Sequence, residues 1–185
     1  MTDKKHSVVK KLIWLFTAAA VVILDQLSKK AVLSEFHEEG ASRVAIKGLL
    51  NFTYIRNPGA TAGILANNRW VFMAASTVII IALAVYLAVS KKQSAFGGIA
   101  FAMVIGGGIG NMIDRVAYGE VVDFLDVTAT DVFPFNCIFN VADAFVVVGC
   151  ILLVISFIAD EAKAKKEEKS DENTPKEPDL PSSEE

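Results

Sequence analysis

Four long apolar stretches alternate with polar segments along the chain. A helix needs roughly 20 mostly apolar residues to cross a bilayer. Residues 71–89 and 95–113 each provide 19 uncharged positions, and residues 141–159 are almost entirely apolar. The first stretch, residues 12–24, is too short alone, so we expect its helix to continue through the next turns. The pattern predicts four transmembrane helices, at about residues 11–33, 70–89, 95–114 and 141–160.

Two segments between and after these stretches have a different character. Residues 43–56 carry β-branched and aromatic side chains with partial alternation, and Pro58 and Gly59 follow as a turn signal. Residues 163–185 are almost all charged or polar, so they cannot bury enough apolar surface to offset the entropy of ordering. We expect an all-α membrane protein of residues 1–162, with a small extracytoplasmic β-cradle between helices 1 and 2. A disordered acidic cytoplasmic tail is expected to follow.

Composition and charge support this interpretation and give an orientation. Hydrophobic residues make up 53% of the 185 positions, and mean hydropathy is +0.45, which disfavours a soluble globule. Cytoplasmic flanks of membrane helices are rich in Lys and Arg. On one side lie 11 of the 18 basic residues: Lys4, Lys5, Lys10, Lys11, Lys91, Lys92, Lys163, Lys165, Lys166, Lys169 and Lys176. Both termini are therefore expected in the cytoplasm.

Two other classes fit the sequence poorly. A net charge of −3 gives no indication of a nucleic-acid partner. A cleaved secretory signal peptide would need small residues after its apolar core. Instead the polar sequence from Asp25 to Lys29 follows that core, so we interpret the first stretch as an uncleaved span.

Ionisable residues collect at the outer ends of the predicted helices. Asp25 lies near the outer end of the first helix, Asp114 and Arg115 end the third, and Asp143 lies one turn inside the fourth. Asp123 follows the third helix, in a strand-like run. Carboxylates at membrane depth are costly and are candidates for function by default. In a four-helix bundle these residues would converge on one layer near the outer surface.

Several of these residues also have a purely structural explanation. Asp25 and Lys29 are spaced i, i+4 and could form a simple ion pair on a helix surface. Asp114 could end its helix and meet water. Asn140 and Asp143 fit a helix N-cap followed by an acid at the third helical position.

Most catalytic side-chain combinations are missing from the sequence. The histidines, His6 and His37, have no partner at zinc-ligand spacing, and Cys137 has no histidine nearby to act as its base. Ser28 and Lys29 are adjacent in a helix and point in different directions, so they cannot form a dyad with each other. We expect no metal and no cofactor.

A pair of aspartates remains as the best candidate for chemistry. Two carboxyl groups that are forced together cannot easily both ionise, and one pKa rises. The ionised member can take a proton from water while the protonated member donates to a carbonyl. Asp123 and Asp143 are the best pair, because Asp123 has apolar neighbours in sequence and a returning loop could bring the two together.

Two alternative functions would use the same acidic residues. The first is a small proton- or cation-conducting protein, which needs polar residues along the whole membrane depth. The second is a metal-dependent lipid-head-group enzyme using Asp114, Asp123 and Asp126. A nucleotide-binding loop at residues 106–110 is rejected because no βαβ unit surrounds these glycines, whose small size instead favours close helix packing.

Five motifs in order resemble those of one family. They are Asp25-Gln26-Leu27-Ser28-Lys29, Arg56-Asn57-Pro58-Gly59-Ala60, Gly110-Asn111-Met112-Ile113-Asp114-Arg115, Val121-Val122-Asp123-Phe124 and Phe139-Asn140-Val141-Ala142-Asp143. Together with four spans, they closely resemble the bacterial lipoprotein signal peptidases (signal peptidase II) over roughly residues 10–160. One departure is Thr61-Ala62-Gly63, where the family usually has Ala-Phe after the second motif.

The resemblance implies an aspartyl endopeptidase of the bacterial cytoplasmic membrane. Such enzymes cut prolipoproteins just before a diacylglyceryl-modified cysteine, contact membrane lipids and are inhibited by globomycin. The motif positions imply Asp123 and Asp143 as the catalytic dyad. Other motif residues are implied to hold substrate or orient the dyad: Asn57, Asn111, Arg115 and Asn140. A further group is implied to support the site: Asp25, Lys29, Asp114 and Gly59.

Overall fold

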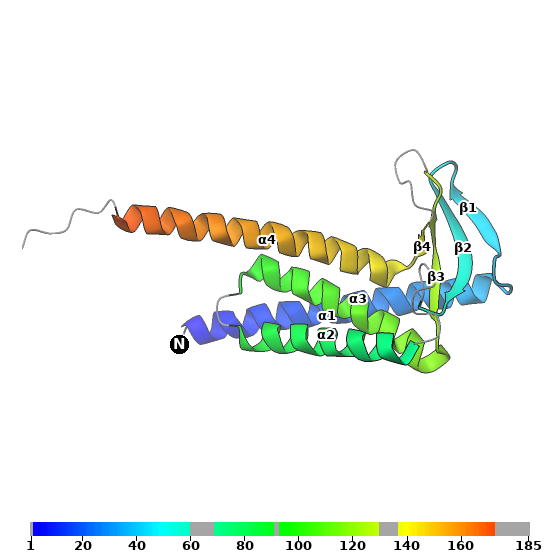
Figure 1. Ribbon diagram of the computed structural model, residues 1–185, viewed down its shortest axis with the longest axis horizontal. Helices are drawn as coiled ribbons and strands as arrows, with labels where there is room; N and C mark the ends of the chain where they lie inside the picture. Colours follow the sequence, from blue (N-terminus) through cyan, green and yellow to red (C-terminus); the bar gives the residue numbers. More distant parts are fainter. Residues whose placement is uncertain (1, 60–68, 91–92, 130–136, 173–185) are drawn as a thin grey trace, which may run out of the picture.

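The computed structural model describes residues 2–59, 69–90, 93–129 and 137–172. Its helices are α1 (Thr2–Glu35), α2 (Arg69–Val89), α3 (Ala95–Tyr118) and α4 (Val141–Glu172). Its strands are β1 (Ser42–Ile46), β2 (Leu50–Asn57), β3 (Val121–Val127) and β4 (Ile138–Phe139). The helices form an elongated bundle with the sheet at one end, opposite the beginning of α1 and the end of α4 (Figure 1).

Three of the helices have the length and apolar character needed to cross a membrane. They are Ser7–Glu35 of α1, Ala95–Tyr118 of α3 and Val141–Lys166 of α4. The apolar part of α2, Met73–Val89, is shorter. The chain therefore has a helix at each of the four predicted positions, and three of them meet the criteria for a span.

The sheet is built from two distant parts of the chain. Its strands pair antiparallel in the order β1-β2-β3-β4. The hairpin of β1 and β2 confirms the prediction for residues 43–56. The sheet extends beyond the β-cradle that we expected between the first two helices, because β3 and β4 come from the segment between α3 and α4. Ile55 of β2 pairs with Asp123 of β3, which places the sheet directly beside a candidate catalytic residue.

The last helix is longer than expected. α4 continues to Glu172, through ten residues that we expected to be disordered. Ala, Lys and Glu in this extension are good helix formers, and Lys165 pairs with Glu161 one turn earlier at 2.7 Å. Residues 173–185, the rest of the expected tail, lie outside the described residues.

Glycines allow α3 to pack closely against its neighbours. A Cβ atom at Gly106 would lie 2.8 Å from the carbonyl oxygen of Ala18 in α1, and one at Gly107 would lie 2.4 Å from that of Ala142 in α4. The helices therefore approach at positions where only glycine fits. Toward the end of the bundle opposite the sheet, apolar side chains fill the interior: Trp14, Leu87, Phe101, Ala102 and Ile105. This apolar filling disfavours the conducting alternative.

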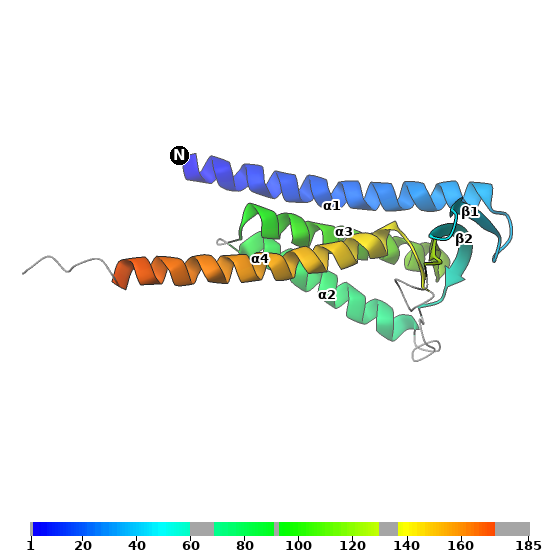
Figure 2. The same cartoon turned by 90° about the horizontal axis from the view of Figure 1, so that it is seen from above.

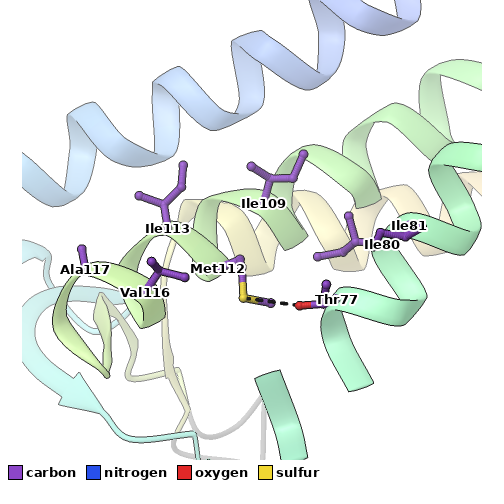
Figure 3. Close-up of a pocket in the computed structure, with 8 residues that line it drawn as sticks. All are labelled: Thr77, Ile80, Ile81, Ile109, Met112, Ile113, Val116 and Ala117. Atoms are coloured by element: carbon purple, nitrogen blue, oxygen red, sulfur yellow. Dashed lines mark hydrogen bonds between the residues drawn. The ribbon is translucent and has the colours of Figure 1, made fainter. Parts of the chain in front are cut away.

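An apolar groove lies between α2 and α3. Figure 2 shows α2 diverging from α1 toward the sheet end of the bundle. The groove has a volume of about 400 Å³, and Figure 3 shows the side chains that line it. It is lined by Thr77, Ile80, Ile81, Ile109, Met112, Ile113, Val116 and Ala117. Because none of these side chains titrates, the groove itself offers no acid or base for catalysis.

Neighbouring glycines on α3 provide a test of this packing. Gly107→Ala should lower the free energy of unfolding by about 1–3 kcal/mol, because its methyl group would overlap the backbone of α4. Gly108→Ala is the matched control, since its methyl group would meet only the movable end of Ile80. Thermal unfolding of both variants in detergent measures the difference, and equal stabilities would contradict this view of the interface.

Candidate active site

A buried ionic cluster joins α1 to α3. Lys29 Nζ lies 2.8 Å from Asp25 Oδ2, 2.9 Å from Asp114 Oδ2 and 3.0 Å from Asn111 Oδ1. Asp25, Lys29 and Asp114 are at most 3% exposed. Asp25 and Lys29 therefore form the predicted ion pair, but the pair is buried and does not lie on a helix surface. Asp114 is also buried, so the explanation that it ends its helix and meets water is wrong.

The start of α4 is capped as the sequence predicts. The backbone N–H of Asp143 donates to Asn140 Oδ1 at 2.9 Å, and the backbone N–H of Asn140 donates to Asp143 Oδ2 at 3.2 Å. This reciprocal pair is a capping box, in which each side chain satisfies a backbone donor at the helix start. Capping does not exclude a role in chemistry, because both side chains have further partners.

Asn140 connects the two candidate catalytic carboxylates. Its side-chain Nδ2 lies 2.6 Å from Asp123 Oδ1, while its backbone N–H reaches Asp143. Asn111 Nδ2 donates to Asp143 Oδ1 at 2.7 Å, and Asn111 Oδ1 accepts from Asn140 Nδ2 at 3.0 Å. The structure thus brings Asp123 and Asp143 into one hydrogen-bond network, although they belong to a strand and a helix.

Asn57 approaches the same network from the sheet. Its Nδ2 donates to Asp123 Oδ2 at 2.8 Å, and its Oδ1 accepts the backbone N–H of Gly59 at 2.9 Å. Gly59 has a φ of +100°, which side chains rarely tolerate. The turn at Gly59 therefore orients the Asn57 amide so that its NH₂ group faces the Asp123 carboxylate.

Arg115 adds a second positive charge near the carboxyl groups. Its Nη1 lies 3.4 Å from the carbonyl oxygen of Asn111, and its guanidinium interacts electrostatically with Asp114, Asp123 and Asp143. Among the described residues, the site contains four carboxyl groups and two cations, those of Lys29 and Arg115. This imbalance in a buried region favours the retention of one proton.

The environment of Asp123 raises its pKa. This carboxyl group is 1% exposed, and burial raises its pKa from the ordinary 3.8 to about 6. The charge of Asp143 contributes to the rise, whereas hydrogen bonds from Asn57 and Asn140 oppose it. A carboxyl group with a pKa near 6 can exist in either protonation state close to neutral pH, as general acid–base chemistry requires.

Some features of the site could not be predicted from spacing. The sequence predicts no role for Gln26, which lies in the first of the five motifs, yet its amide lies within the ionic cluster. Asp126 accepts a hydrogen bond from Thr53 at 2.8 Å, on the sheet. In the described part of the chain, no three His, Cys, Asp or Glu side chains form a group suited to a metal. The motif departure at residues 61–63 lies outside the described residues.

A coupled carboxylate pair at one end of a membrane helix bundle is suited to hydrolysis by an acid and a base. The sequence model of one family, described as signal peptidase (SPase) II, matches residues 17–159. The chain belongs to this family.

Curated relatives and solved structures agree with this assignment. The lipoprotein signal peptidase of Halalkalibacterium halodurans is 38% identical over 157 residues, covering 84% of this chain and 98% of the relative. That of Bacillus subtilis is 37% identical over 158 residues, covering 85% and 100%. A solved bacterial membrane enzyme superposes with a TM-score of 0.74 at 32% identity, covering 89% of this chain and 93% of that structure.

The raised pKa of Asp123 predicts a pH-dependent stability. Because this pKa is higher in the folded chain than in the unfolded one, its contribution to stability is full below about pH 3.8. The contribution is lost as the pH rises through about 6. Asp123→Asn cannot ionise, so the margin between its free energy of unfolding and that of the wild type should shift in favour of the variant by roughly 3 kcal/mol as the pH rises from below 3.8 to well above 6. Chemical unfolding in detergent at several pH values measures this margin, and a constant margin would contradict it.

Proposed function

We propose that the protein is an aspartyl endopeptidase that removes signal peptides from prolipoproteins, cutting just before a diacylglyceryl-modified cysteine. The observation that carries this proposal is the network through Asn140, which binds both Asp123 and Asp143. Membership of the signal peptidase II family supports the reaction. The carboxylate network supports the aspartyl mechanism.

The surroundings of the two aspartates favour different roles. Asp143 lies in the first turn of α4 and accepts hydrogen bonds from Asn111 Nδ2 and from the backbone N–H of Asn140. Asp123 is buried in β3, and its raised pKa favours a retained proton. We therefore assign Asp143 as the base and Asp123 as the acid of the resting dyad.

Hydrolysis then proceeds with water as the nucleophile. Asp143 takes a proton from the water molecule while the water oxygen attacks the scissile carbonyl carbon. Asp123 gives its own proton to the carbonyl oxygen. The tetrahedral intermediate collapses as its C–N bond breaks. Asp143 gives the proton it took from water to the leaving nitrogen, and Asp123 regains a proton from a hydroxyl group of the intermediate as the signal peptide departs with a new carboxyl group. The cysteine keeps its lipid and gains a free amine, and the dyad again holds one proton.

Neighbouring polar groups are placed to hold the substrate. Asn57, Asn111, Arg115 and Asn140 surround the two carboxylates and carry donors suited to peptide carbonyls. A lipid-modified cysteine keeps its acyl chains in the membrane, which fixes the scissile bond at one depth and lowers the entropic part of the barrier. Compounds of the globomycin type would compete for the same groups.

We also propose the membrane arrangement. All four helices cross the bacterial cytoplasmic membrane, both termini lie in the cytoplasm, and the sheet and dyad lie at the outer face. The clustering of lysines before the first span, between the second and third, and after the fourth supports this orientation. The position of the sheet, opposite the start of α1 and the end of α4, is consistent with it.

Neutral variants of the dyad test the reaction. Asp123→Asn and Asp143→Asn should each fold and insert but lose cleavage of a diacylglyceryl-prolipoprotein by a factor of about 10⁴ or more. Asp126→Asn, on the same strand as Asp123, is the matched control and should stay active, because Asp126 bonds Thr53. Cleavage should persist in a chelator. Full activity of either dyad variant, or loss of activity with the chelator, would contradict the proposal.

The hydrogen bond from Asn57 predicts a shift in the pH profile. This bond lowers the pKa of Asp123, so Asn57→Ala should raise that pKa further. The acid of the dyad would then keep its proton to higher pH, and the alkaline limb of kcat/KM should move upward. Cleavage rates measured across pH for wild type and variant give the shift. A downward shift would show that Asn57 does not act on the proton of Asp123.

A further inference from the structure

Two buried carboxylates hold the backbone beside the proposed dyad. Asp25 Oδ1 accepts a hydrogen bond from the backbone N–H of Ala142 at 2.9 Å. Asp114 Oδ2 accepts one from the backbone N–H of Val122 at 3.1 Å. Ala142 and Val122 each directly precede one of the two proposed catalytic aspartates in the sequence. Each catalytic residue is thus fixed through its neighbour to a different carboxylate.

Gln26 bridges these two carboxylates through one atom. Its Nε2 lies 2.9 Å from Asp114 Oδ1 and 3.2 Å from Asp25 Oδ2. Neither of these oxygens bonds the backbone of Ala142 or Val122. The same Nε2 lies 3.2 Å from the carbonyl oxygen of Gly110 in α3. The Gln26 amide therefore connects α1 and α3 to two backbone tethers, which are the hydrogen bonds from Ala142 to Asp25 and from Val122 to Asp114.

The space around this bridge is closely limited. A Cβ atom at Gly110 would lie 2.6 Å from Asp25 Oδ2, so α3 can approach Asp25 only where it has no side chain. Lys29 binds the cluster with a full charge, at Asp25 Oδ2 and Asp114 Oδ2. Gln26 supplies donors without a further charge, so it joins the carboxylates and leaves the charge balance unchanged.

We propose that Gln26 is a positioning residue of the dyad, which sets the separation of the two catalytic carboxyl groups by fixing Asp25 and Asp114 relative to each other. This inference rests on the proposed aspartyl peptidase function. A displacement of about 1 Å between reacting groups can lower a rate by about a hundredfold. The loss expected on breaking one bridge, with Lys29 still in place, is about tenfold.

Two substitutions separate the hydrogen bonds of Gln26 from its packing. Gln26→Met keeps the size of the side chain but removes the donors, and should lower kcat about tenfold with little change in KM. Gln26→Glu has the same shape but adds a carboxylate facing Asp25 and Lys29 of α1 and Asp114 of α3. Its activity relative to wild type should rise as the pH falls, because the protonated acid can donate again. Gln93→Met, at the opposite end of the bundle, is the matched control and should keep full kcat.

Hydrogen exchange provides a readout that does not depend on cleavage. In Gln26→Met, peptides covering residues 121–124 and 141–144 should both exchange faster than in wild type and in Gln93→Met, because both tethers loosen together. Unchanged exchange at either segment would overturn the inference. So would an unchanged kcat per folded Gln26→Met enzyme, or a relative activity of Gln26→Glu that does not vary with pH.

The same experiments distinguish this inference from the proposed function. If wild-type protein cleaves no diacylglyceryl-prolipoprotein, the proposed function fails, while the exchange measurement still decides whether Gln26 couples the two segments. If Gln26→Met does not fold, Gln26→Glu at low pH provides the test. Recovery of exchange protection and of cleavage there supports the bridge, and failure to recover overturns it.

Discussion

The buried ammonium group of Lys29 holds the sheet end of the bundle together. Lys29 contacts two carboxylates and one amide at 2.8–3.0 Å, and they come from both α1 and α3. Removing one partner of a buried ion pair leaves an uncompensated charge, which destabilises far more than an exposed pair would. Three other connections involve the groups that Lys29 holds: the hydrogen bond from Ala142 of α4 to Asp25, the hydrogen bond from Val122 of β3 to Asp114, and the orientation of the Asn111 amide. The proposed dyad is assembled on these three connections.

Small residues make this cluster geometrically possible. α3 lies between α1 and α4, and its glycines let the backbone of one helix approach the side chains or carbonyl oxygens of the next. Gly107 faces α4 directly at Ala142, and Gly110 leaves room for the Asp25 carboxylate. Apolar packing at the opposite end of the bundle and close backbone contact near the site therefore have separate functions. The first stabilises the bundle, and the second sets the distances between polar groups.

Much of this architecture follows from the sequence, and the remainder has physical causes. Hydrophobic length predicts the helices, and the alternation at residues 43–56 predicts one hairpin. Pairing of β3 with β2 could not be predicted, because strand partners far apart in sequence leave no local signal. The chemistry of the residues and the family resemblance predict Asp123 and Asp143 as the catalytic pair, and the structure places them in one hydrogen-bond network. The contacts of Gln26 could not be predicted, because an amide beside a charged residue has no distinctive pattern until its three acceptors are known.

The composition of the sheet has a consequence for biogenesis. The hairpin before α2 emerges from the ribosome first, but its partner β3 and the start of α4 are made only after α3. Asp123 and Asp143 cannot join one hydrogen-bond network until the start of α4, with Asn140 before it, has been made. A nascent chain in which the start of α4 has not yet been made therefore lacks the assembled pair of aspartates that we propose as the catalytic dyad.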